Sequence, residues 1–173
     1  MTIDLRNDAR EITERIARQV DRYASEAARD KSLPRVSAIE VGYAFDQRGW
    51  FFCHFDTRED HDRDGEWTVF LDQEPYSNDL LERTHWYEGI CGGEPGPTTF
   101  IMMDGSTRVL EDVTEEEVAR FLGEFIKAVV LQANHQGLFR KLPTRDTCQI
   151  DIEEFNGNWA WPEYDGLGKV NLI

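Results

Sequence analysis

Residues 38–55 have the sequence AIEVGYAFDQRGWFFCHF, which is the clearest structural signal in the chain. Up to Phe45, large hydrophobic side chains alternate with small or polar ones, and this is the period of a half-buried β-strand. Turn-forming residues follow at 46–49, and the aromatic run at 50–55 returns as a second strand. We therefore expect a β-hairpin in this part of the chain.

Three further parts of the chain show the same strand pattern. Residues 67–71 alternate after an acidic loop, and residues 148–152 alternate near the C-terminal side. The stretches FIMM at 100–103 and RVL at 108–110 flank a turn with the sequence Asp-Gly-Ser-Thr. This last arrangement predicts a second hairpin.

Helical periodicity appears before the first hairpin and after the second. In the stretch before the first hairpin, apolar residues recur at steps of three and four, which predicts an N-terminal amphipathic helix. Its apolar positions are Leu5, Ala9, Ile12, Ile16, Val20, Tyr23 and Ala27. A late helix is expected from Thr114 to about Gln136, because Thr114 and Glu117 form a capping box and Gly137 is a typical stop. A short helix is also expected near 78–88.

The expected order of elements is therefore α-βββ-α-ββ-α-β. A chain of 173 residues without internal repeats or low-complexity linkers is large enough for one hydrophobic core. We expect a single α+β domain over residues 1–173. Its sheet should be mainly antiparallel and flanked by the N-terminal helix and the late helix.

The chain is strongly acidic, with 34 acids against 19 bases and a net charge of −15. The acids cluster at 56–66, 111–117 and 146–173. Such a field repels nucleic acid and anionic membranes, so neither is an expected partner. It attracts a basic protein and accelerates encounter with it, although acidity also serves solubility alone.

The termini and the cysteines indicate a cytoplasmic protein. The first residues lack a basic start and an apolar core, so no signal peptide is expected. Apolar runs are too short to span a membrane. Cys53, Cys91 and Cys148 are widely spaced and form neither a disulfide framework nor a metal-binding pair, which is typical of a reducing compartment. No cofactor signature is present, and we expect no cofactor.

Part of the acidic loop resembles the opening of a calcium-binding loop. Asp60, Asp62, Asp64 and Gly65 form the pattern DxDxDG, in which alternate carboxylates converge on one hard cation. The match fails at the twelfth position, where Leu71 replaces the required glutamate. We expect a solvated acidic loop without a metal, with a bound cation as the alternative.

Histidine and cysteine residues suggest a catalytic alternative. His54 and Asp56 share one face of the predicted strand, and His85 precedes Cys91 in a glycine-rich stretch. A site near these four residues would suit a small hydrolase-like enzyme. However, the spacing guarantees no contact, and no GxSxG, HExxH or phosphate-binding motif is present. We therefore assign no catalytic residue, and an enzyme is the less favoured interpretation.

Aromatic and acidic residues occur together near the C-terminus. Aromatic side chains supply desolvated contact area and carboxylates attract a basic partner, so the combination is typical of an interface. The predicted partner interface comprises Asp56, Asp60, Asp62, Asp64, Glu153, Glu154, Trp159, Trp161 and Tyr164. The alternative is that Trp159 and Trp161 close one end of the core.

Four features together carry a family resemblance. They are the N-terminal amphipathic helix, the aromatic hairpin VGYAFDQRGWFFCHFD at 41–56, the late capped helix, and the strand and tail IDIEEFNGNWAWPEY at 150–164. In this outline the chain resembles the small cytosolic immunity proteins of bacterial polymorphic-toxin and contact-dependent systems. The resemblance implies stoichiometric binding that blocks a toxin, without catalysis. Together with the acidity, it indicates an immunity-type inhibitor that binds a basic protein by steric and electrostatic complementarity.

Overall fold

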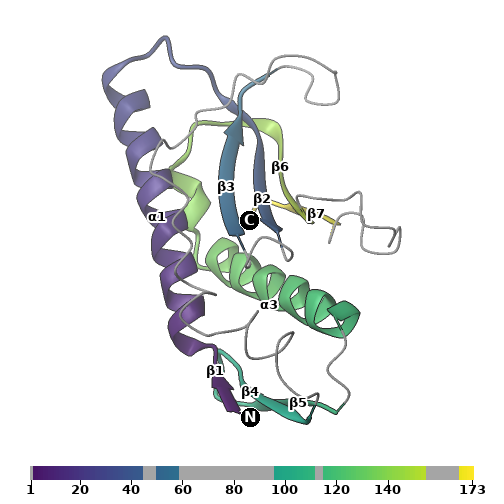
Figure 1. Cartoon of the computed structure of the whole chain (residues 1–173). Helices are drawn as coiled ribbons and strands as arrows, with labels where there is room; N and C mark the ends of the chain where they lie inside the picture. The colour runs from purple at the N-terminus through teal and green to yellow at the C-terminus, as the bar shows by residue number, and fades with distance from the viewer. Residues whose placement is uncertain (1, 45–49, 59–95, 112–114, 155–167) are drawn as a thin grey trace.

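The computed structural model describes residues 2–44, 50–58, 96–111, 115–154 and 168–173 (Figure 1). Helices and strands from these ranges confirm the expected α+β class. In chain order they are β1 (Thr2–Asp4), α1 (Arg6–Arg29), β2 (Val36–Ala44), β3 (Trp50–Asp56), β4 (Thr98–Ile101), β5 (Thr107–Leu110), α3 (Glu115–His135), the 3₁₀ helix η2 (Leu138–Lys141), β6 (Thr144–Glu154) and β7 (Gly168–Asn171).

The larger sheet has the strand order β3-β2-β6-β7. Strands β2 and β3 are antiparallel, with Ala38 opposite Asp56 and Ala44 opposite Trp50, so the first hairpin is confirmed. β6 is antiparallel to β7 but parallel to β2. Parallel neighbours need a long connection, and the chain from β3 to η2 separates β2 from β6.

The smaller sheet has the order β1-β4-β5. β4 and β5 are antiparallel, which confirms the second hairpin, with the first strand two residues earlier than expected. Gly105 in the turn has a φ of 82°, a left-handed conformation that glycine adopts without a steric cost. β1 runs parallel to β4, and Ile3 pairs with Phe100 on the face that is buried.

The two long helices form where the sequence predicts them. In α1 the apolar positions from Ala9 to Tyr23 are buried and Ala27 is partly buried, as expected. In α3 the positions from Phe121 to Ala133 supply the buried face. Gly137 ends this helix with a φ of 73°, and its N–H donates to the carbonyl of Asn134 at 2.8 Å.

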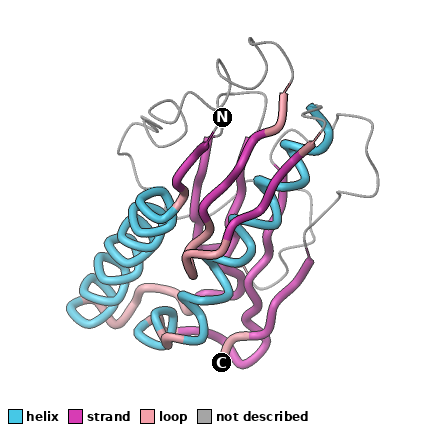
Figure 2. The backbone as a smooth tube through the Cα atoms, turned by 90° about the horizontal axis from the view of Figure 1, so that it is seen from below, coloured by secondary structure: helices cyan, strands magenta, loops and turns pink. Residues whose placement is uncertain are grey.

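One cluster of buried side chains joins both helices and both sheets. Tyr23 of α1 packs edge-on against Phe55 of β3 at 5.6 Å between ring centroids, and Phe100 of β4 packs against Phe121 of α3 at 4.2 Å. In Figure 1, α3 lies between the two sheets, and in Figure 2 α1 lies to the side of the strands while α3 crosses them. The shared core explains how two small sheets form one packed unit.

The structure differs from the sequence-based expectation in its sheets. Two mixed sheets replace one mainly antiparallel sheet, and β1, β7 and η2 are additional elements. β1 and β7 have three and four residues, too few for a clear alternating pattern. The strand expected at 67–71, the helix expected at 78–88 and the cap at Thr114 lie outside the described residues.

Candidate functional site

The larger sheet has one apolar face and one polar face, because successive side chains of a strand point to opposite sides. Ile39, Val41 and Phe55 belong to the apolar face, which packs on the core. The opposite face carries polar residues from all four strands, and we call it the polar sheet face. It includes Glu40 of β2, His54 and Asp56 of β3, Gln149 and Asp151 of β6, and Lys169 and Asn171 of β7 in register beside them.

Three titratable residues form a row across the polar sheet face. Glu40 lies opposite His54 on one side and beside Asp151 on the other. Directly opposite residues in an antiparallel pair have Cβ atoms about 5 Å apart, so Glu40 is the carboxylate nearest in register to His54. Glu40 is only 8% exposed. No sequence motif marks Glu40 as a site residue, although its place in the alternating strand is the signal that puts it on this face.

Burial sets the charge of His54. Desolvation lowers the pKa of its imidazole below the usual value of 6.5, so the ring is neutral at pH 7. A neutral imidazole offers one acceptor nitrogen and one donor, which is the form a general base needs. The row of Glu40, His54 and Asp151 therefore has the residue types of an acid–base site.

Asp56 is hydrogen-bonded to Arg58. Its two carboxylate oxygens accept hydrogen bonds from Arg58 Nε at 3.0 Å each and from Nη2 at 2.6 Å, and one also accepts the Arg58 backbone N–H at 2.9 Å. Ser37 Oγ donates to the Asp56 backbone carbonyl at 2.9 Å. The Asp56 side chain is fully buried and that of Arg58 is 13% exposed.

Asp56 is one residue of the predicted interface. Its carboxylate is enclosed and paired with the Arg58 guanidinium at the end of β3. A role of Asp56 in partner binding stays a prediction.

Most of the other predicted site residues lie outside the described residues. These are Asp60, Asp62, Asp64, His85, Cys91, Trp159, Trp161 and Tyr164. Glu153 and Glu154 belong to the end of β6, where Glu154 pairs with Tyr43 of β2. Because Asp56 pairs with Ala38, the acidic stretches after β3 and after β6 begin at opposite ends of the sheet.

The described cysteines are inert core residues. Cys53 and Cys148 are both buried free thiols, and burial raises their pKa values to about 12 and about 11. Thiols with such pKa values are poor nucleophiles at neutral pH. Within the described ranges, no group of three histidine, cysteine or acidic residues is arranged to hold a metal ion.

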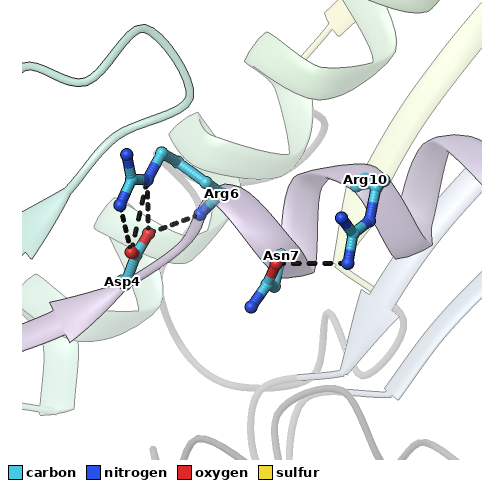
Figure 3. Close-up of polar contacts among 4 residues, drawn as sticks. All are labelled: Asp4, Arg6, Asn7 and Arg10. Carbon is cyan, nitrogen blue, oxygen red and sulfur yellow. Dashed lines mark hydrogen bonds and ion pairs between the residues drawn. The ribbon is translucent and has the colours of Figure 1, made fainter.

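A second polar cluster lies at the start of α1 (Figure 3). Asp4 accepts hydrogen bonds from Arg6 Nε at 3.0 Å and Nη2 at 2.6 Å, and Asn7 accepts one from Arg10 at 3.2 Å. Asp8 is 4% exposed, and burial raises its pKa to about 7, with nearby Glu11 and Asp4 adding to the shift.

Further along α1, an open groove of about 500 Å³ follows the helix surface. Its described lining residues are Arg10, Glu11, Glu14, Arg15 and Arg18. Glu11 with Arg15 and Glu14 with Arg18 have the i, i+4 spacing of stabilising helix pairs. Because three arginines and two glutamates share this surface, its charges largely cancel and it selects no charged ligand strongly.

Comparisons with protein-family models, curated proteins and solved structures found no significant match to this chain. Neither α1 nor α3, the two long helices of the described ranges, is long and apolar enough to cross a membrane.

Proposed function

We propose that this protein binds a basic protein partner through charge and shape complementarity, as an immunity-type inhibitor does. The observation that carries the proposal is the position of the acidity. Residues 59–95, between β3 and β4, contain eleven acids and two bases, which is −9 of the net −15. The other residues contain 23 acids and 17 bases. Residues 59–95 thus carry the largest single share of the negative charge, beside the acidic stretches at 111–117 and 146–173.

The start of this connection supports the proposal. Arg58 is the last base before residues 59–95, and its largely buried ion pair with Asp56 neutralises its charge. Ser37 holds the backbone at the same point. The acidic segment therefore begins from a fixed strand end, and its field is not cancelled by Arg58. A basic partner would be attracted over about 10 Å at 0.1 M salt.

Association kinetics with the partner test the proposal. The partner is isolated by pull-down from the native host, and neighbouring genes are inspected for a toxin. The on-rate should fall sharply between 0.1 M and 1 M salt, since exposed charges are screened over about 3 Å at the higher concentration. The off-rate should change little, because aromatic contacts such as those proposed for Trp159, Trp161 and Tyr164 are insensitive to salt.

Charge-reversal variants sharpen this test. The triple variant Asp60→Lys, Asp62→Lys, Asp64→Lys should slow association at least tenfold. A matched control is Glu14→Lys, Asp30→Lys, Asp146→Lys, which makes the same change in net charge at exposed positions elsewhere. Equal on-rates for both variants, or an on-rate indifferent to salt, would contradict the proposal.

A small hydrolase-like enzyme is the second candidate. One observation favours it: neutral, half-buried His54 lies opposite the buried carboxylate Glu40. His54→Gln should then abolish hydrolysis of a panel of activated esters, whereas His135→Gln at the exposed end of α3 should not. Equal turnover by the two variants would remove this candidate.

A further inference from the structure

Strand β5 is the outer strand of the smaller sheet and lies at the lower margin of the molecule in Figure 1. It pairs with β4, and no other described strand pairs with it. Thr107, Arg108 and Val109 are all exposed. Val109 is 46% exposed and, among the described residues, only Ile173 is another large hydrophobic residue with comparable exposure. An outer strand presents backbone N–H and C=O groups that can pair with a strand of a partner.

The register shows which backbone groups of β5 point outward. Met102 N donates to Ser106 O at 2.8 Å where the hairpin closes. Hydrogen-bonded and non-hydrogen-bonded pairs alternate in an antiparallel ladder, so the next bonded pair is Phe100 with Arg108. The N–H and C=O groups of Thr107 and Val109 therefore point away from β4.

An independent contact agrees with this assignment. Ile101 pairs with Thr107, and its carbonyl accepts the Leu5 N–H at 3.0 Å on the opposite side of β4. The backbone groups of Ile101 thus face β1, which is required if Ile101 and Thr107 form a non-hydrogen-bonded pair.

Acidic residues lie at both ends of β5. Asp104 and Glu111 are exposed, and hydrogen bonds from Ser106 lower the pKa of Asp104, so this carboxylate is ionised at neutral pH. The positive charge of Arg108 is directed away from the edge, because its guanidinium lies 5.1 Å from the centre of the Phe121 ring and forms an ion pair with Glu124.

We propose that the β5 edge binds an extended basic segment of the partner as an added strand. This inference rests on the proposed function and names the docking surface of the partner. Thr107 and Val109 supply the backbone hydrogen bonds, the Val109 side chain supplies apolar contact, and Asp104 and Glu111 select lysine or arginine. A second copy of this chain does not fit the edge, because pairing two such edges would bring like charges together.

A labelled peptide tests the edge directly on the full chain. The probe is a fluorescent seven-residue peptide of alternating lysine and valine, measured by anisotropy at low salt. It should bind, whereas the same peptide with alternate N-methyl groups should bind at least tenfold more weakly and a glutamate–valine peptide should not bind. Hydrogen exchange of the Thr107 and Val109 amides should slow when the peptide is present.

Proline substitutions provide matched variants. Val109→Pro removes an outward N–H that the ladder does not use, and proline is tolerated on such an edge. Arg108→Pro removes an inward N–H and should lower Tm further than Arg108→Ala, which loses the same side-chain contacts, and this comparison checks the register. Val109→Pro should bind the lysine–valine peptide at least tenfold more weakly, with a nearly unchanged Tm. Val109→Thr keeps the N–H, so its affinity for the peptide should stay within threefold of that of the original chain. A folded Val109→Pro variant that binds as tightly as the original chain would overturn the inference.

Binding measurements with the native partner distinguish a failure of the β5-edge inference from a failure of the proposed function. If the partner binds in a salt-dependent manner and Val109→Pro has no effect, the edge is wrong and the proposed function stands. If no basic partner binds but the peptide protects Thr107 and Val109, the proposed function fails and the edge remains a binding surface for basic strands. If the chain dimerises through this edge, seen by light scattering and lost in Val109→Pro, the inference is overturned.

Discussion

Asp56 and Arg58 form a closed fork at the end of β3, with Nη2 2.6 Å from the carboxylate and the backbone N–H of Arg58 bonded to the same group. Asp4 and Arg6 make the same set of contacts before α1, also with a shortest distance of 2.6 Å (Figure 3). The first fork is buried, whereas the Asp4 and Arg6 side chains are 40% and 56% exposed. The chain thus contains one local motif in two different environments.

This pair gives a controlled test of burial. Asp56→Ala leaves a largely buried guanidinium without its carboxylate and should destabilise the fold by about 3–5 kcal/mol. Asp4→Ala removes the same contacts in solvent and should change stability little. Urea denaturation of both variants measures the difference. Equal losses of unfolding free energy in the two variants would show that burial does not determine how much Asp56 stabilises the fold.

Asp8 should make the protein less stable as the pH rises. Its pKa is raised from 3.8 to about 7 in the folded state, so the folded chain binds more protons than the unfolded chain between these values. The contribution of Asp8 to the free energy of unfolding is fully present below pH 4 and is lost as the pH rises from about 4 to 7. This contribution is at most about 4 kcal/mol. Asp8→Asn should remove that slope.

Denaturation of both chains at pH 5, 6, 7 and 8 measures this effect, and the difference between them isolates Asp8. The comparison is needed because the lowered pKa of His54 acts in the opposite sense, reducing stability as the pH falls below 6.5. A difference in unfolding free energy between the two chains that stays constant at all four pH values would contradict the raised pKa of Asp8.

Asn134 should hold the last residues of the chain against α3. Its side chain is buried, donates to the Asn171 carbonyl at 2.9 Å and accepts the Ile173 N–H at 3.3 Å. Asn134→Ala leaves these groups unsatisfied and should cost about 1–3 kcal/mol, with faster hydrogen exchange at Ile173. Gln149→Ala is the control, because its bond to the Asn171 side chain is exposed. Similar losses in the two variants would argue against this role.

Gly137 and Gly105 should respond differently to alanine. Both have a positive φ, so each substitution costs about 1 kcal/mol of backbone strain. At Gly137 a new Cβ would also lie 3.2 Å from Arg140 Cδ, whereas nothing lies within 4 Å at Gly105. Gly137→Ala should therefore lower Tm further than Gly105→Ala. The reverse order in thermal melts would contradict the prediction.

The elements predicted correctly are those with a local signal. The steps of three and four from Ala9 to Tyr23 and the alternation around Val41 reflect the geometry of single elements. β7 is missed because its sequence, Gly-Lys-Val-Asn, has little strand propensity and forms by pairing with β6. The burial of Asp56 is missed for a similar reason, because a charged residue in the sequence does not reveal the neighbour that neutralises it.

Composition and periodicity are properties of the chain, and they establish the strong acidity, the two amphipathic helices and the two hairpins. The parallel pairing of β2 with β6, the division into two sheets and the position of Glu40 opposite His54 come from contacts between residues far apart in sequence. A shift of one residue in a strand register moves every side chain to the other face. Such registers are selected by packing the whole core at once, so these relationships appear only when the chain is folded.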